Sequence, residues 1–195
     1  MTAIAAEDGD PAREIMEGTY RALCEHGYAD LTMQAIADDC EKSTAALHYH
    51  YDSKHDLLLA FLEFLSARFE ANVLPDPDAP PETRLRTLVD DLLTDDEAPD
   101  TEFRTAIMEI KAQAPYEPDF QAHLADVDES LRAAVRDAVA EGVERGDFRA
   151  VDPDDVATFV VTAVMGAYSR RVAVDADIER SRALLHGYLD ERLVA

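Results

Sequence analysis

The sequence predicts an all-α protein. Apolar and small residues recur at helical spacing from the start of the chain, for example at Ile15, Thr19 and Leu23. No segment alternates strictly between apolar and polar residues, as a half-buried strand would. Aspartate followed by proline, a pattern that favours the start of a helix, precedes two of the predicted helices, at residues 10–11 and 152–153. Together these patterns predict nine helices and no sheet.

Two helices are expected at the start of the chain. The first runs from Pro11 to about Glu25, and Gly27 can end it in a left-handed conformation. Thr32 is expected to cap the second helix. Leu31 and Ile36, on either side of that cap, can pack against each other and fix the entry of the chain into the helix.

A third helix is expected at residues 44–50, capped by Ser43 and reached through a turn at Glu41 and Lys42. A helix this short depends on the helices behind it. Its outer face carries small or polar side chains and an aromatic ring, a set that can approach base edges and phosphates. These residues are Thr44, Ala45, His48 and Tyr49. The alternative is the corner of a plain helical bundle.

Lys54 lies in the first turn of the next helix, which Ser53 and Asp56 are expected to cap as a reciprocal pair. A cation at this end of a helix works against the helix dipole. Its position therefore suggests an outside anion such as a phosphate.

Residues 11 to about 65 resemble the helix-turn-helix domain of the TetR family of transcriptional regulators. The matching residues are Ile15, Gly27, Tyr28, Thr32, Ile36, Ala37, Ser43, Leu47, Tyr49, His50, Tyr51, Ser53 and Lys54. The chain departs from the family pattern at Glu41, where the turn usually has glycine, and at His48, where the third helix usually has tyrosine. Glu41 would need a left-handed backbone, at a cost of about 1 kcal/mol.

The resemblance implies a DNA-binding domain at residues 1–54 and a helical domain for effector binding and dimerisation at residues 55–195. Contacts with bases or their backbone would come from Thr44, Ala45 and Tyr49. Contacts mainly with phosphate would come from Thr32, Gln34, Ser43, His48, His50 and Lys54.

Charge is the unusual feature of the composition. The 195 residues include 42 acids and 18 bases, for a net charge of −24, and residues 1–54 alone hold eleven acids and four bases. Such acidity either excludes nucleic acid as a partner or indicates a cytoplasm at molar salt, where the Debye length is about 3 Å and repulsion from DNA is screened. We favour the second interpretation, since scarce lysine and abundant aspartate resemble the proteins of halophilic archaea.

The rest of the composition bounds the class of protein. Apolar residues make up 47% of the chain, enough for a sizeable core. The sequence has neither an apolar run that suits a membrane span nor a signal-peptide pattern, so we expect a cytoplasmic protein with no membrane partner. Cys24 and Cys40 make no disulfide framework and are expected to be small buried thiols.

Six further helices are expected, at about residues 54–73, 82–93, 101–114, 118–145, 153 onward and 177–193. The helix from residue 153 is nearly apolar over residues 156–168. It is either core of its own subunit or, with the last helix, a two-fold four-helix interface, and the resemblance implies the interface. The interface residues would be Phe159, Val160, Ala163, Val164, Ala167, Leu184, Leu185, Tyr188 and Leu189.

The resemblance also implies an apolar effector cavity among the fourth to eighth helices. Its lining would be Phe61, Phe64, Leu65, Leu88, Leu92, Phe103, Ile107, Met108, Phe120, Leu124 and Tyr168, with Arg104 or His123 holding a polar end of the effector. The alternative for each apolar residue is that it simply fills the core. Glu109 lies about one turn from Arg104, and the two could form a pair in the pocket or an exposed ion pair.

The sequence carries no recognisable catalytic, metal or cofactor motif. It has no CxxC or HExxH spacing, no GxGxxG, no phosphate-binding loop and no GxSxG elbow. We therefore expect neither an enzyme nor a metal or cofactor. The prediction is a homodimeric repressor that a hydrophobic or amphipathic small molecule releases from a palindromic, double-stranded DNA operator, with the fourth helix as the lever. The rival hypothesis is an acidic helical protein that binds a ligand or partner and no longer binds DNA.

Overall fold

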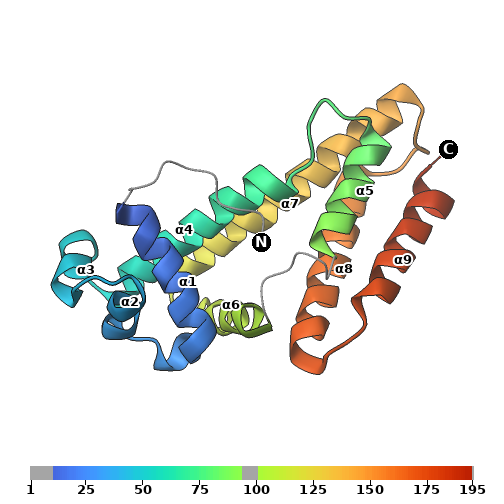
Figure 1. Cartoon of the computed structure of the whole chain (residues 1–195). Coiled ribbons are helices and arrows are strands. Elements are labelled where there is room, and N and C mark those ends of the chain that lie inside the picture. Colours follow the sequence, from blue (N-terminus) through green and yellow to red (C-terminus); the bar gives the residue numbers. More distant parts are fainter. Residues whose placement is uncertain (1–10, 94–100, 195) are drawn as a thin grey trace. The chain divides into compact units, whose positions relative to one another are not determined.

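The computed structural model describes residues 11–93 and 101–194, which form nine α-helices (Figure 1). The helices are α1 (Pro11–Asp30), α2 (Met33–Asp39), α3 (Thr44–His50), α4 (Lys54–Val73), α5 (Pro81–Leu92), α6 (Thr101–Gln113), α7 (Pro118–Arg145), α8 (Pro153–Val174) and α9 (Ile178–Tyr188). A π-helical turn, Leu189–Leu193, follows α9. Within these residues the β-type pairing is one isolated bridge, Phe148 to Val194, so the all-α prediction is confirmed. None of these helices combines the length and the apolar character that crossing a membrane would need.

The predicted start and stop signals lie at the ends of the first helices. Gly27, with a φ of 70°, interrupts α1 as expected, although a short helical stretch follows it. The Thr32 hydroxyl accepts a hydrogen bond from the N–H of Ala35 at 3.1 Å and caps α2. The Ser43 hydroxyl accepts from the N–H of Ala46 at 3.2 Å and caps α3. Local hydrogen bonds therefore determine where the helix-turn-helix elements begin.

The chain divides into two compact units. Unit 1 comprises residues 1–66 and 99–124, and unit 2 comprises residues 67–98 and 125–195. Unit 1 is larger than the predicted domain of residues 1–54, because the first part of α4 and the whole of α6 pack with α1, α2 and α3. A functional boundary near residue 54 stays a prediction.

Unit 1 has an apolar core to which α1, α2, α3, α4, α6 and the start of α7 contribute. Its fully buried side chains include Ile15, Leu23, Ile36, Leu47 and Phe61. Leu47 is the buried residue of α3. One leucine therefore anchors this short helix to the core, while most of its other side chains face away from it.

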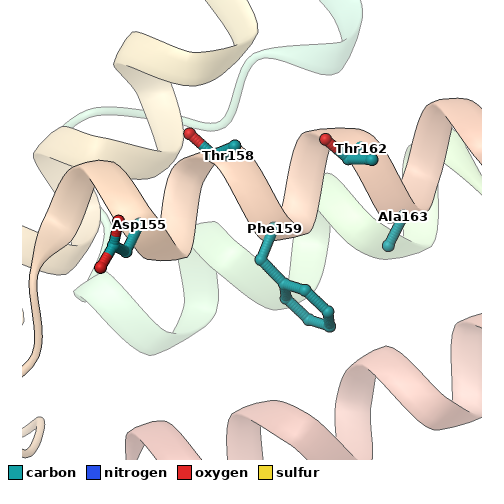
Figure 2. Close-up of a pocket in the computed structure, with 5 residues that line it drawn as sticks. All are labelled: Asp155, Thr158, Phe159, Thr162 and Ala163. Atoms are coloured by element: carbon teal, nitrogen blue, oxygen red, sulfur yellow. The ribbon is translucent and has the colours of Figure 1, made fainter.

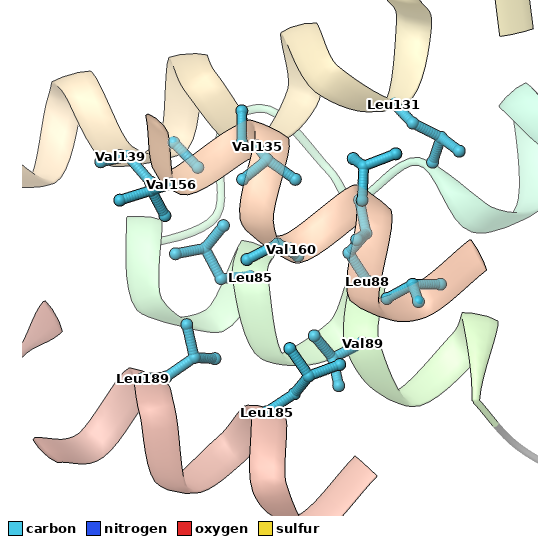
Figure 3. Close-up of a cluster of buried hydrophobic side chains, with 14 of the residues drawn as sticks. Leu85, Leu88, Val89, Leu131, Val135, Val139, Val156, Val160, Leu185 and Leu189 are labelled. Atoms are coloured by element: carbon cyan, nitrogen blue, oxygen red, sulfur yellow. The ribbon is translucent and has the colours of Figure 1, made fainter. Parts of the chain in front are cut away.

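Unit 2 has a separate core in which α5, the second part of α7, α8 and α9 converge (Figure 3). Figure 3 shows Leu85 of α5, Val135 of α7, Val160 of α8 and Leu185 of α9 pointing toward one another. Each of these four side chains is at most 3% exposed. Burial of this kind contributes about 1.5–3 kcal/mol for each large apolar side chain, so this cluster is the main source of stability in unit 2.

An ionic network joins α5 to α9 and the π-helical turn beside this core. His186 Nε2 lies 2.7 Å from a carboxylate oxygen of Asp90. Arg86 binds Glu82 of its own helix at 2.7 Å and also binds Asp190. Hydrogen bonding to Asp190 and to Glu82 raises the pKa of the Arg86 guanidinium. The network holds α9 in register against α5.

The core of unit 2 corrects part of the predicted dimer interface. Five of the nine predicted residues are buried inside their own subunit, because α8 and α9 turn them toward the core; they are Val160, Val164, Ala167, Leu185 and Leu189. Phe159 and Leu184 are exposed, at 46% and 67%, and Ala163 and Tyr188 are half-buried. α8 thus supplies core residues on one face and accessible apolar residues on another.

Candidate DNA-binding and effector sites

Polar side chains connect α2 to α3 beside the turn. Thr44 Oγ1 donates to Gln34 Oε1 at 3.2 Å, and the Gln34 amide donates to Asp38 at 2.7 Å. Gln34 lies in the first turn of α2 and Thr44 begins α3. A phosphate contact by Gln34, as the sequence predicts, would therefore have to compete with hydrogen bonds inside the protein.

The outer face of α3 is accessible, as the sequence predicts. Ala45, His48, Tyr49 and His50 are exposed and Thr44 is half-buried. Tyr49 is 85% exposed, and its ring meets the His50 ring edge-on with the centroids 5.1 Å apart. An exposed aromatic ring flanked by two imidazoles forms a surface with a hydrogen-bond donor or acceptor at each side.

Glu41, in the turn between α2 and α3, has the left-handed backbone that the sequence predicts, with a φ of 54°. The turn is closed by the Lys42 N–H, which donates to the Ala37 carbonyl at 2.9 Å. The Lys42 ammonium reaches back to Glu14 of α1 at 2.5 Å. Backbone strain at Glu41 is thus offset by hydrogen bonds on both sides of the turn.

Lys54 is held by the protein's own backbone, which corrects the explanation offered for its position. Its Nζ donates to the carbonyl oxygens of Leu31 at 2.9 Å and Tyr28 at 3.3 Å, and lies 4.9 Å from the centroid of the Tyr28 ring. Carbonyls at the end of α1, rather than an outside anion, therefore accommodate a cation in the first turn of α4. An ammonium has three donors, so a phosphate contact is compatible with this geometry and stays a prediction.

Glu109 of α6 holds the same end of α1 from another side. Its carboxylate accepts a hydrogen bond from the N–H of Tyr28 at 2.7 Å, beside the kink at Gly27. The pair with Arg104 that the sequence suggested stays a prediction. The contact with Tyr28 could not be predicted from the sequence, because the two partners are 81 residues apart. Tyr28 is thus bound through its N–H by α6 and through its carbonyl by α4.

The predicted effector lining is divided between the two units. Leu88, Leu92 and Tyr168 belong to unit 2 and the other ten residues to unit 1. The side chain of Phe103 lies outside the part that the structure describes. Phe61, Leu88 and Phe120 are at most 1% exposed. A side chain with almost no accessible surface contacts no water-sized space, so these three fill the cores in this conformation, as the alternative interpretation held.

The half-buried residues of the predicted lining are still candidates for contact with an effector. In unit 1 they are Phe64, Leu65, Ile107, Met108, His123 and Leu124, and in unit 2 they are Leu92 and Tyr168. Arg104 is nearly buried, at 9%. An effector site formed by the unit 1 residues therefore stays a prediction.

His123 and Ser66 form a polar pair in unit 1. The Ser66 hydroxyl lies 2.7 Å from His123 Nε2 and 2.9 Å from the Leu62 carbonyl oxygen. A hydroxyl can both donate and accept, so this pair can present either kind of hydrogen-bonding group to a ligand.

A groove lies along one face of α8 (Figure 2). Its volume is about 480 Å³ and its lining residues are Asp155, Thr158, Phe159, Thr162 and Ala163. Phe159 points toward α9, where its ring packs 4.5 Å from that of Tyr188. The sequence identified Phe159 and Ala163. The three polar residues of the groove, Asp155, Thr158 and Thr162, were not predicted from the sequence. Spacings of three and four residues nevertheless place all five lining residues on one helix face.

One group of side chains in the described part of the chain has the composition of a metal site. Ligand atoms of Glu25, His26 and Asp39 lie within 4.8 Å of one another. Glu25 and His26 are exposed, and Arg21 donates to the Asp39 carbonyl at 2.6 Å. A guanidinium at this position disfavours a bound cation, so we assign no metal to the group.

Comparisons with known proteins agree with this geometry. Residues 15–61 match the family of bacterial regulatory proteins called tetR, and residues 81–194 match the C-terminal domain of BetI-type transcriptional repressors. The repressor AcnR of Corynebacterium efficiens is 29% identical over 86% of this chain and 84% of its own length.

The solved structures that this chain resembles are also transcriptional regulators. A TetR transcription regulator from Haloarcula marismortui is 41% identical, with a TM-score of 0.86, over 93% of this chain and 97% of that one. A regulator from Saccharomonospora viridis, solved in complex with choline, is 22% identical and shares the fold, with a TM-score of 0.80 over 94% and 97% of the two chains. These relatives are regulators and not enzymes. The chain belongs to the TetR family of DNA-binding transcriptional regulators.

Proposed function

We propose that this regulator is a repressor that binds a palindromic operator as a homodimer and leaves it when a small hydrophobic or amphipathic molecule binds. The observation that carries this proposal is the outward face of α3, where Tyr49 is 85% exposed while Leu47 anchors the helix to the core. A helix held in this way can enter a major groove without unfolding the domain behind it.

The proposed contacts divide into two kinds. Thr44, Ala45 and Tyr49 would meet bases or their backbone, and a second set would meet mainly phosphate. That set is Thr32, Gln34, Ser43, His48, His50 and Lys54. The hydroxyls of Thr32 and Ser43 already accept the capping hydrogen bonds of α2 and α3. They would contact phosphate at the N-terminal ends of these helices.

Two substitutions test the assignment. Lys54→Ala should weaken binding to all duplexes alike, and should also lower the free energy of unfolding by about 1 kcal/mol because two carbonyls lose their partner. Thr44→Ala should change which sequence is preferred, by about 1–3 kcal/mol at one base pair. Both are measured by fluorescence titration of operator and scrambled duplexes at molar KCl. Wild-type affinity and preference in both variants would discard the assignment.

A homodimer is proposed because one short α3 offers few contacts, whereas two copies about one helical turn apart can read a palindrome. The accessible apolar residues of the α8 groove and α9, above all Phe159 and Leu184, are the surface we assign to it. Each large apolar side chain buried there would stabilise the pair by about 1.5–3 kcal/mol.

Leu184→Glu should therefore raise the dimer dissociation constant at least about a hundredfold, because both copies lose a buried leucine and gain a carboxylate. Light scattering at molar KCl measures the change. Tyr116→Glu is the matched control, since Tyr116 is 81% exposed and lies in unit 1. A variant that stays dimeric, or a wild-type protein that is monomeric, would contradict this interface.

The charge of the protein supports a halophilic archaeal origin and a cytoplasm at molar salt. The net charge is −24 and three of 195 residues are lysine, and a 41% identical structural neighbour comes from Haloarcula marismortui. The free energy of unfolding should then rise from low to molar KCl, because salt screens the repulsion between carboxylates. Equal stability at both concentrations would contradict this origin of the charge.

A further inference from the structure

The arginines and lysines of the proposed DNA-binding domain all contact other groups of the protein. Residues 11–54 contain Arg13, Arg21, Lys42 and Lys54 as their arginines and lysines. Arg13 binds Glu17 at 3.0 Å, and Arg21 donates to the Asp39 carbonyl at 2.6 Å.

Lys42 and Lys54 are similarly occupied: Lys42 binds Glu14 at 2.5 Å, and Lys54 donates to two backbone carbonyls. Arginines and lysines normally supply the charge that attracts phosphate. Here carboxylates offset the charges of Arg13 and Lys42, whereas Arg21 and Lys54 keep their charge while they donate to carbonyls.

The third helix itself carries two groups that can become cations. Its sequence, TAALHYH, has neither lysine nor arginine, but His48 and His50 are both exposed. Residues two apart on an α-helix point about 200° apart, with the intervening residue between them. A helix that presents Tyr49 to a groove therefore directs one imidazole toward each wall, where the phosphates of the two strands lie.

The charged groups on the elements around α3 are mostly acidic. They are Arg13, Glu14, Glu17, Arg21, Glu25, His26 and Asp30 of α1, Asp38 and Asp39 of α2, Glu41 and Lys42 of the turn, Asp52 after α3, and Lys54, His55 and Asp56 in the first turn of α4. Acids outnumber arginines and lysines among these residues, so their net charge is negative and works against the approach of phosphate.

We propose that operator binding takes up protons at His48 and His50, so that the regulator binds its operator more tightly as the pH falls. This inference rests on the proposed DNA-binding function. Histidine is the side chain whose charge changes between about pH 5 and 8. A phosphate beside the ring favours the imidazolium, which then donates a charge-assisted hydrogen bond.

The linkage between proton binding and DNA binding determines how operator affinity changes with pH. The complex holds more protons than the free protein and free DNA, so its formation is favoured at low pH and weakened as the pH rises and the rings become neutral. Lys and Arg contacts would give no such dependence over this range, because those groups stay charged throughout it.

The test is a fluorescence titration at constant molar KCl with a duplex from the region upstream of the protein's own gene, at about pH 6 and about pH 8. The wild-type protein should bind roughly tenfold more tightly at the lower pH. The double variant His48→Gln/His50→Gln should lose most of this response, so that its affinities at the two pH values differ far less than those of the wild type. His26→Gln, an exposed histidine of the same unit, is the control and should respond like the wild type.

The outcomes separate this inference from the function on which it rests. Operator binding with equal affinity at both pH values overturns the inference and leaves the DNA-binding function standing. A pH response that persists in the double variant also overturns it, because other groups would then take up the protons. A wild-type protein that binds no duplex at either pH overturns the proposed function itself.

Discussion

Replacing Gly142 with alanine should lower the free energy of unfolding by about 3 kcal/mol, one of the largest effects of any single methyl group in this protein. Gly142 lies in α7, and a Cβ there would be 2.1 Å from Cδ2 and 2.4 Å from Cε2 of Phe148. The Phe148 ring is 4% exposed and belongs to the core of unit 2. A rigid ring in a packed core cannot retreat by more than an ångström without displacing its neighbours.

The same contact organises the end of the chain. After α7 the backbone turns sharply, and the N–H groups of Asp147 and Phe148 both donate to the Gly142 carbonyl, at 2.9 and 3.0 Å. Phe148 then pairs with Val194, and the Arg149 N–H donates to the Leu193 carbonyl at 2.9 Å. A displaced ring would therefore loosen the last residues from the core as well.

A double-mutant cycle isolates the clash. Phe148→Ala should itself cost about 3–5 kcal/mol as a core truncation. In the Gly142→Ala background it should cost much less, because the added methyl group then meets no ring. Chemical denaturation at one protein concentration in molar KCl measures all four proteins. Strictly additive effects would show that the methyl group and the ring do not meet.

Gly18→Ala should have the second large effect, on the DNA-binding unit. A Cβ at Gly18 would lie 2.1 Å from Cys40 Sγ and 3.2 Å from Cys40 Cβ and N. This is where α1 crosses the end of α2, and the Cys40 thiol points at the Ile15 carbonyl, 3.8 Å away. Burial raises the pKa of this thiol, so it stays protonated and behaves as a small packing group.

The methyl group should push α2 away from α1 and carry α3 with it. We expect a loss of about 2 kcal/mol in the free energy of unfolding. Operator affinity should fall at least about tenfold, because a displacement of α3 by an ångström misaligns its contacts. Cys40→Ala in the same chain should recover part of both losses, since it removes the closest atom. Full wild-type operator affinity in Gly18→Ala alone would contradict this account of the crossing.

The helix boundaries were predictable because they depend on local chemistry. Thr32, Ser43 and Asp152 each accept hydrogen bonds from N–H groups two or three residues later, and such contacts are visible as sequence spacing. Gly27 and Glu41 likewise have the positive φ values expected at the ends of their helices.

Contacts between distant segments were not predictable in this way. The position of Lys54 in the first turn of one helix suggests an outside anion, whereas its partners are the carbonyls of Tyr28 and Leu31. The contact of Glu109 with the N–H of Tyr28 likewise joins segments that are far apart in the sequence. In α8 the composition was apolar on nearly all sides, so periodicity could not separate the core residue Val160 from the exposed Phe159.

The central claim is that α3 faces outward and that the two α3 helices of a dimer enter major grooves of the same DNA duplex. Footprinting of the region upstream of the protein's own gene, with wild-type protein at molar KCl, tests it most directly. We expect two protected half-sites of inverted sequence, with centres about one helical turn apart or a small multiple of it. Uniform cleavage of that DNA and of randomised genomic fragments, at protein concentrations that saturate a TetR-type operator, would contradict it.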